Sequence, residues 1–415
     1  MTPKRLIAIA SLNQFCHWFM IGLFFPVMTL LLLERGLTLF QIGAIVAVYS
    51  STVILLELPT GGLADAIGRK RVYLISLVAL FAAGLGMLIA WNFVTMMIVF
   101  FFMGMARALS SGSLDAWFVD EFQRIHPEGN LQPALARIGV FIPLGLGLGA
   151  LIGGILPMTL GTVTRQIPGL TKYSGNLITI TLCLIVHFFL TLRLVQEHLP
   201  ETSKSVKFFE GFQQLPVVLT TSIQYGVKHP TISLLLGSAI GWGIGVSGLE
   251  LLWQPQVKML LGSDAQTWIF GVLSAGYFLA SAAGNLSANP ICRIFHHDYP
   301  RILLVTRLLM GIGVFLLALQ QHLAGFMPVY WGLFVFNGLS NSPNAAIFNA
   351  HIPKEQRSTL LSFQSFVEQS GGLIGALCMG YISEHISIPI AWFFAAEILV
   401  LSGLAYVFLP GQKRK

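Results

Sequence analysis

The chain has 415 residues, of which 55% are hydrophobic and 10% are charged, and its mean hydropathy is +0.77. A soluble core cannot bury so large an apolar fraction, whereas apolar runs of about 20 residues match the hydrocarbon thickness of a bilayer. The net charge of +7 is spread over short clusters between apolar runs, so it forms no continuous basic face and predicts no nucleic-acid partner. The composition therefore predicts a polytopic all-α membrane protein embedded in a lipid bilayer.

The apolar runs predict about twelve membrane spans in two sets of six. We expect the first set near 6–33, 39–64, 72–91, 93–121, 134–160 and 174–196. We expect the second set near 231–260, 266–289, 300–320, 325–350, 358–384 and 387–409. The first run is too long in its apolar part for a cleaved signal peptide, so it should be retained as the first span.

The longest polar segment, 197–230, separates the two sets of spans. It predicts an N-terminal half at 1–196, a cytoplasmic linker, and a C-terminal half at 231–415. Four apolar residues recur at helical spacing within this linker: Phe208, Phe209, Phe212 and Leu215. This spacing fits an amphipathic segment on the membrane surface, and a solvated loop is the alternative.

Lys and Arg residues are distributed unevenly across the predicted loops. With the N-terminus in the cytoplasm, the outer side receives only Arg35, Arg165, Lys172 and Lys258. We therefore expect both termini in the cytoplasm and the protein in the cytoplasmic (inner or plasma) membrane.

Two of the first spans carry polar side chains. In the first span, Asn13 and His17 are four residues apart and should project together towards the bundle interior, where they could line a substrate cavity. A hydrogen-bonded packing role is the alternative for His17.

In the second span, Glu57 lies two turns before Asp65, where partial desolvation makes protonation at working pH feasible. Glu57 is therefore a candidate proton site.

The densest charge cluster of the chain is GGLADAIGRKR, residues 61–71, between two long apolar runs. Gly61 allows close helix approach, and Gly68 permits a tight turn. Asp65 lies near the membrane boundary, where it can accept hydrogen bonds or cap the positive end of a nearby helix, such as one starting at about Ser358. The basic residues must lie in water and so set the topology.

This segment resembles the signature of the major facilitator superfamily, a glycine, leucine and aspartate followed by a glycine and a basic run after helix two. The helix count, the two halves and the linker extend the resemblance over the whole chain. It implies alternating access, with a small-molecule substrate bound between the halves. It also implies a gate formed by Gly61, Asp65, Gly68 and Arg69, with Asp120 or Glu121 as the partner of Arg69. A purely topological role is the alternative for the basic residues.

The fourth span carries Arg107, Ser111 and Asp115, which at spacings of four share one helical face. A charge inside a span is costly, and Asp115 would supply the acid that Arg107 needs. The sequence RALSSGSLDAWFVDE resembles the family's helix-four motif, in which a buried arginine is linked to proton transfer. Arg107, Asp115 and Glu57 are thus the proton-coupling candidates, and an ion pair that only orients the helix is the alternative.

The fifth span contains GLGLGALIGG, in which Gly145, Gly149, Gly153 and Gly154 have the spacing of close helix packing. It resembles the family's antiporter motif, with Ala150 in the position of the motif's proline. This resemblance supports antiport and efflux.

The second half supplies further polar candidates for the substrate cavity. They lie in three spans and are Glu250, Trp253 and Gln254, then Asn337 and Asn341, and finally Gln364 and Glu368. Trp253 could contact a substrate. An anchor at the membrane interface is its alternative role.

No phosphate-binding loop or catalytic constellation is present in the sequence, so we expect no enzyme and no cofactor. An ion gradient, most simply of protons, is then the energy source. We expect a monomer that exports a small, partly hydrophobic compound in exchange for protons. The alternatives are a proton-coupled symporter that imports a metabolite, and a membrane scaffold or receptor that transports nothing.

Overall fold

The computed structural model describes residues 2–198, 220, 226, 228–263, 265–352 and 357–409. Every regular element within these residues is a helix, which confirms the predicted all-α fold class. Among them, eleven helices are long and apolar enough to cross a membrane. A further long helix, α16 (Arg357–His385), has 29 residues and matches the more polar eleventh span of the prediction.

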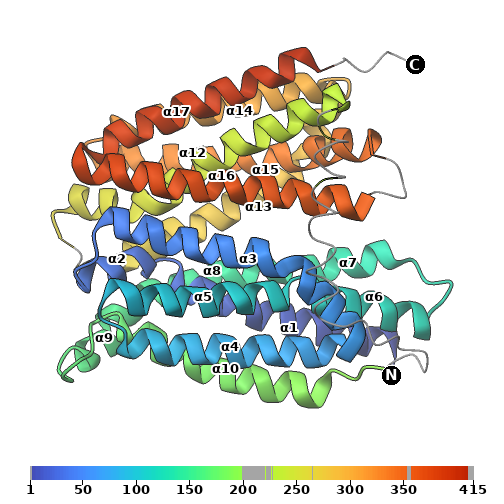
Figure 1. Cartoon of the computed structure of the whole chain (residues 1–415), viewed down its shortest axis with the longest axis horizontal. Coiled ribbons are helices and arrows are strands. Elements are labelled where there is room, and N and C mark those ends of the chain that lie inside the picture. The colour runs from blue at the N-terminus through green and yellow to red at the C-terminus, as the bar shows by residue number, and fades with distance from the viewer. Residues whose placement is uncertain are drawn as a thin grey trace. The chain divides into compact units, whose positions relative to one another are not determined.

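The first six predicted spans correspond to the helices up to α10, several of them in two pieces (Figure 1). In chain order these are α1 (Pro3–Phe24), α2 (Met28–Glu34), α3 (Leu39–Ile67), α4 (Arg69–Ile89), α5 (Phe93–Ser110), α6 (Ser113–Ile125), α7 (Leu131–Gly139), α8 (Phe141–Ile155), η1 (Leu156–Met158), α9 (Leu160–Thr164) and α10 (Ser174–Leu194).

The last six predicted spans correspond to long, mostly unbroken helices. They are α12 (Pro230–Leu261), α13 (Trp268–Ile294), α14 (Tyr299–Ala318), α15 (Leu323–Ala350), α16, and α17 (Ile388–Leu404) followed by η3 (Ala405–Phe408). The predicted linker lies mostly outside the described residues, and so do Phe208, Phe209, Phe212 and Leu215.

The fourth predicted span is not one continuous helix. Gly112 has a φ of 69°, in the left-handed region that ends a regular helix, so α5 stops at Ser110 and α6 starts at Ser113. The expectation that Arg107, Ser111 and Asp115 share one helical face is therefore wrong, because Arg107 and Asp115 belong to different helices.

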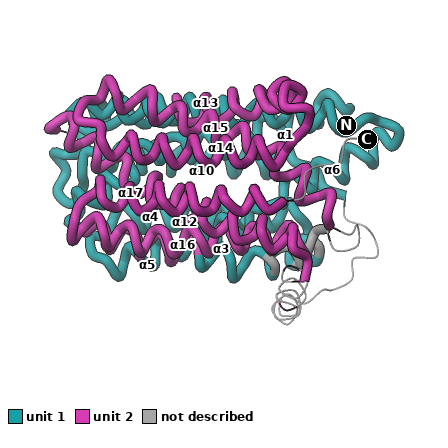
Figure 2. Tube along the Cα trace, turned by 90° about the horizontal axis from the view of Figure 1, so that it is seen from above, with its two compact units in different colours: residues 1–36, 51–215, 265–275 teal, residues 37–50, 216–264, 276–415 magenta. Residues whose placement is uncertain are grey.

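The chain divides into two compact units, coloured separately in Figure 2. Unit 1 comprises Met1–Gly36, Ser51–Leu215 and Ala265–Ala275. Unit 2 comprises Leu37–Ser50, Pro216–Asp264 and Gly276–Lys415. Each unit draws most of its residues from one predicted half, and each also takes in a short stretch from the other. The boundaries at 1–196, 197–230 and 231–415 stay a prediction.

Unit 1 is built around the close packing of α1 on α8. A Cβ atom added at Gly149 would lie 2.2 Å from the carbonyl oxygen of Phe19, and one at Gly153 would lie 2.5 Å from that of Leu23. Only glycine fits at these positions, because a backbone oxygen of the neighbouring helix occupies the space. The glycine spacing of the fifth span therefore serves helix packing in this unit.

Unit 2 packs α12 on α16 in the same way. A Cβ atom at Gly243 would lie 2.4 Å from the carbonyl oxygen of Glu368, and one at Gly371 would lie 2.4 Å from that of Ile240. Large aromatic side chains fill the rest of this core, and the fully buried ones include Trp253, Phe326, Tyr330, Phe334 and Trp392.

Candidate functional site

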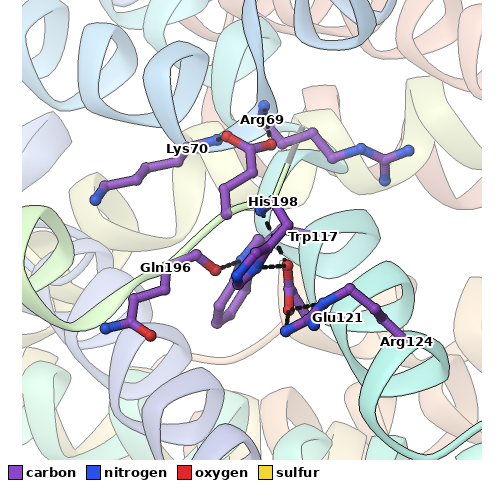
Figure 3. A network of polar contacts seen from close by, with 8 residues as sticks. Arg69, Lys70, Trp117, Glu121, Arg124, Gln196 and His198 are labelled. Carbon is purple, nitrogen blue, oxygen red and sulfur yellow. Dashed lines mark hydrogen bonds and ion pairs between the residues drawn. The ribbon is translucent and has the colours of Figure 1, made fainter. Parts of the chain in front are cut away.

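The N-terminus of α4 is capped by a carboxylate from the chain segment after α10 (Figure 3). Gly68, the residue before the helix, has a φ of 100° and no side chain to cap it. The backbone N–H groups of Arg69 and Lys70 instead donate to the two carboxylate oxygens of Glu197, at 2.6 and 3.1 Å. An anion at this position satisfies free N–H groups and complements the helix dipole.

Two basic side chains of the motif extend the same network within unit 1. Arg69 Nη2 lies 3.2 Å from Asp120 Oδ2, on α6. Lys70 Nζ donates to the carbonyl oxygen of Leu192 near the end of α10, at 2.8 Å. The side chain of Asp120 is 61% exposed, so solvent weakens this ion pair. Asp120 is one of the two partners that the sequence predicted for Arg69, and its role in a gate stays a prediction.

Glu121, the other predicted partner of Arg69, has different partners. Its buried carboxylate accepts from Arg124 Nε at 2.9 Å and from the backbone N–H of His198 at 3.1 Å. Trp117 Nε1 also donates to the carbonyl oxygen of Gln196 at 2.9 Å (Figure 3). The segment 195–198 is therefore held between the start of α4 and the face of α6.

Gly61 and Asp65 lie in the last two turns of α3, directly before Gly68. The side chain of Asp65 is outside what the structure describes. The proposed latch through Asp65 stays a prediction for this reason.

The three proton-coupling candidates lie in unit 1 but do not form one ion-paired group. Glu57 Oε1 accepts from Ser111 Oγ at 3.1 Å, and Asp115 Oδ1 accepts from Gln14 Nε2 at 2.6 Å. No ion pair joins Arg107 to Asp115, both of which are described and exposed. The two helices that carry them are separated by the break at Gly112.

Arg107 and Asp115 do share a small cavity of about 50 Å³. Its other lining residues come mainly from α1, α4 and the α5–α6 break, and they are Asn13, Gln14, His17, Trp18, Tyr73, Ser110, Gly112 and Leu114. A space of this size holds one or two waters and no larger solute. It can therefore serve proton movement rather than substrate binding.

Asn13 and His17, the two predicted cavity residues of α1, face this small cavity. Asn13 is 2% exposed and accepts from Thr191 Oγ1 at 2.7 Å, so it also holds α1 against α10. His17 Nδ1 lies 3.2 Å from the hydroxyl oxygen of Tyr73, which lies 3.1 Å from Nε2 of His187. Tyr73 and His187 belong to no motif, so sequence reasoning missed both.

The predicted cavity residues of unit 2 are engaged in polar and aromatic contacts. Glu250 Oε1 accepts from Tyr277 Oη at 3.0 Å, and Gln254 is 1% exposed. Trp253 is fully buried, with its ring centroid 5.5 Å from that of Tyr330. An interfacial anchor must reach the lipid headgroups, so that alternative for Trp253 is wrong.

Three of the four remaining candidates of unit 2 also form side-chain hydrogen bonds. Asn337 Oδ1 accepts from Trp242 Nε1 at 2.9 Å, and Glu368 Oε1 accepts from Gln364 Nε2 at 2.9 Å. Asn341 is exposed. These are hydrogen-bonding groups that a solute could recruit, and the structure leaves their role in binding as a prediction.

Sequence reasoning also missed a buried arginine, Arg307 on α14, which is 6% exposed. Its guanidinium donates to the carbonyl oxygen of Ser238 at 3.1 Å, to Ser402 Oγ at 2.9 Å and to Tyr406 Oη at 3.0 Å. Within the described residues no carboxylate forms an ion pair with it. The sequence around Arg307 gave no signal for this site, because its partners come from three other elements, α12, α17 and η3.

A larger groove of about 660 Å³ runs between α1 and the α7–α8 pair of unit 1. Its lining is apolar apart from two basic residues and a serine, and it consists of Lys4, Ile7, Ala8, Ser11, Leu12, Phe15, Arg137, Val140 and Phe141. Grooves of this size and character bind small organic molecules in many proteins. No group of three His, Cys, Asp or Glu side chains among the described residues could hold a metal ion.

The long apolar helices and the polar side chains enclosed among them are those of a polytopic membrane protein. The family model of the Major Facilitator Superfamily matches residues 10–336 and 261–415. The chain therefore belongs to the major facilitator superfamily.

Similar proteins agree with this assignment. The quinolone resistance protein NorA of Staphylococcus aureus is 23% identical over 418 residues, which cover 99% of this chain and 98% of the relative. The nucleoside transporter NupG has a similar structure, with a TM-score of 0.76, 12% identity, and coverage of 97% of this chain and 98% of that chain. The human organic anion transporter MFSD10 gives a TM-score of 0.66 at 15% identity and covers 98% of this chain and 100% of that chain.

Proposed function

We propose that this protein is a proton-coupled secondary transporter that exports a small, partly hydrophobic compound by alternating access. The observation that carries the proposal is the full-length similarity to NorA, whose name records resistance to quinolones. A transporter that confers resistance to a drug must move the drug away from its target, which favours export.

The groove of unit 1 supports the proposed class of substrate. Apolar side chains of α1 and α8, such as Leu12, Phe15 and Phe141, can bind the hydrophobic part of a solute. Lys4 and Arg137 add positive charge to the same lining and favour a solute with an anionic or hydrogen-bond-accepting group. An apolar body with one such group is the chemistry that we propose for the substrate.

Carboxylates that can take up protons support the proposed energy source. Glu57 and Asp115 lie beside hydroxyl and amide donors, and Arg107 borders the same small cavity as Asp115. Acidic side chains within membrane spans are the groups from which proton pathways are commonly built. We propose that protons enter as the substrate leaves, and that no other cofactor takes part.

We further propose that the protein works as a monomer in the cytoplasmic membrane, with both termini in the cytoplasm. The uneven distribution of Lys and Arg residues over the predicted loops supports this orientation.

Proton-coupled import of a metabolite is the second candidate. The structural similarity to a nucleoside transporter favours it, since that neighbour shares the fold over nearly the whole chain. A scaffold that transports nothing has no comparable support.

Transport in proteoliposomes under an imposed pH gradient tests the proposal. The purified full chain is reconstituted and supplied with a panel that includes quinolones, lipophilic dyes and nucleosides. Exchange of an amphipathic compound against protons is expected. Accumulation of a solute together with protons would establish symport instead, and no flux of any panel member beyond that of empty liposomes would contradict transport.

A further inference from the structure

A chain of three side chains connects three helices in the interior of unit 1. His17 on α1, Tyr73 on α4 and His187 on α10 are joined through the Tyr73 hydroxyl, with oxygen-to-nitrogen distances of 3.2 and 3.1 Å. Tyr73 is 3% exposed and His187 is 1% exposed. The function described so far uses neither of them.

The hydroxyl geometry links the protonation of the two histidines. A tyrosine hydroxyl has one hydrogen to donate, so it can donate to one ring nitrogen and accept from the N–H of the other. If His17 Nδ1 carries a hydrogen, Tyr73 donates to a bare Nε2 of His187, and the reverse assignment is the only other neutral one. A change of tautomer at one histidine therefore requires a change at the other.

The two ends of this chain have different surroundings. His17 lines the cavity of about 50 Å³ that Arg107 and Asp115 also line, so its end can meet water and an acid. At the other end, Nδ1 of His187 is buried and has no hydrogen-bond partner among the residues that the structure describes. A buried polar atom without a partner costs free energy, so its presence calls for an explanation.

Three charged or titratable groups outside this chain of side chains act on it. Arg107 of α5 acts on His17, and Asp115 of α6 and Cys16 of α1 act on Tyr73. The sequence of α8 contains no titratable residue. Asp115 is the only one of these groups that favours a positive charge on an imidazole, and Arg107 opposes it.

We propose that His17, Tyr73 and His187 form a proton relay that moves the coupled proton from the cavity beside Asp115 to His187. The proposal rests on the proposed proton-coupled transport and assigns the inner proton-holding group for it. It adds two residues, Tyr73 and His187, to the carboxylates considered above.

The transfer balances as a sequence of hydrogen-bond exchanges. A proton from the cavity forms a new N–H bond at Nε2 of His17, and the Nδ1–H bond of the same ring breaks. That hydrogen forms an O–H bond at Tyr73 while the original O–H bond breaks and its hydrogen binds Nε2 of His187. His17 and Tyr73 end neutral, and His187 ends as the imidazolium. The same exchanges in reverse return the proton to the cavity.

The first test is direct observation of the coupled histidines. The full chain with 15N-labelled histidine is titrated by NMR, and the signals of His17 and His187 are assigned by the variants His17→Gln and His187→Gln. In the wild type the two rings should titrate together, and Tyr73→Phe should move the midpoint of either ring by about one pH unit. Identical midpoints in wild type and Tyr73→Phe would overturn the relay.

The second test separates coupling from structure. Tyr73→Phe keeps the ring and removes only the hydroxyl, so transport driven by a pH gradient should fall by about 100-fold while solute exchange without a gradient is retained. Ser76→Ala is the matched control, because Ser76 is buried on the same helix and its hydroxyl donates only to the carbonyl oxygen of Tyr73. It should retain both activities.

The outcomes distinguish the relay from the proposed function. Equal loss of driven transport and exchange in Tyr73→Phe would show a structural role and contradict the relay. Full driven transport in Tyr73→Phe would contradict the relay while leaving proton coupling intact. Wild-type flux that ignores the pH gradient would contradict the proposed function itself, and the transport role of the relay with it, even if the NMR titrations remain coupled.

Discussion

Glu197 caps the N-terminus of α4, where the basic motif itself provides no side chain that accepts the first backbone N–H groups. Gly68 provides the positive φ that starts α4, but it has no side chain to satisfy the first N–H groups of the helix. Glu197 supplies the missing acceptor from a position more than a hundred residues further along the chain. The start of α4 and the segment after α10 therefore stabilise each other through these hydrogen bonds.

We expect Glu197→Ala to destabilise unit 1 by about 1 kcal/mol, because loss of a helix cap typically costs that amount. Thermal unfolding of the purified protein in detergent measures the effect. Glu128→Ala is the control, since Glu128 is an exposed loop acid. Equal melting temperatures for the two variants would show that the cap contributes nothing.

Arg307 is a buried charged side chain whose hydrogen-bond acceptors are all neutral groups. A serine hydroxyl, a tyrosine hydroxyl and a backbone carbonyl oxygen accept from its planar guanidinium. Lysine presents a single ammonium group and cannot reach acceptors in that arrangement.

We therefore expect Arg307→Lys to lower the free energy of unfolding by about 2 kcal/mol, through lost hydrogen bonds to a charged group. Arg301 is exposed and lies earlier on the same helix, α14, so Arg301→Lys should change the free energy of unfolding little. A melting temperature of Arg307→Lys equal to that of the wild type would contradict the prediction.

At the scale of helices, glycines on one face of α8 allow its backbone to pack directly against that of α1. Gly149 faces the backbone of α1, whereas Gly147, two residues earlier on α8, has no neighbouring atom within 4 Å of an added Cβ. The same helix therefore contains glycines that packing requires, such as Gly149 and Gly153, and one that it does not require, Gly147.

Gly149→Ala should destabilise unit 1 by about 1–3 kcal/mol, because a methyl group 2.2 Å from the Phe19 carbonyl oxygen forces α1 and α8 apart. Gly147→Ala should be neutral or slightly stabilising, because alanine favours the helix. Thermal unfolding of both variants decides the matter, and equal stability would show that the α1–α8 packing tolerates the methyl group.

At the scale of the whole molecule, the proposed gate predicts a change of state rather than of stability. Asp65→Asn removes the charge that would latch the halves, so it should shift the population towards inward-facing states. Single cysteines placed at the cytoplasmic and outer ends of the helices, in a background free of the four native cysteines, report this shift by their labelling rates. Unchanged labelling relative to a Glu128→Gln control would return residues 61–71 to a purely topological role.

Much of this protein could be predicted from its sequence. Apolar runs of membrane-spanning length identified the helices, and GGLADAIGRKR identified the family that the full-length match shows. The break at Gly112 was missed, because the span 93–121 was treated as one helix although residues 110–113 read SSGS, and the backbone angle of Gly112 places the break there. The expected shared face of Arg107 and Asp115 failed for that reason.

The sequence by itself determined the fold class and the family, because bilayer thickness and a compact charged motif leave local signals along the chain. Only the tertiary structure decided which polar groups meet. His17 is the only histidine of the first predicted span. Folding joins it to Tyr73, 56 positions further along the chain, and through Tyr73 to His187, 170 positions further along. Hydrogen bonds depend on distance in space, and no periodicity in the sequence records the packing of α1, α4 and α10 that creates it.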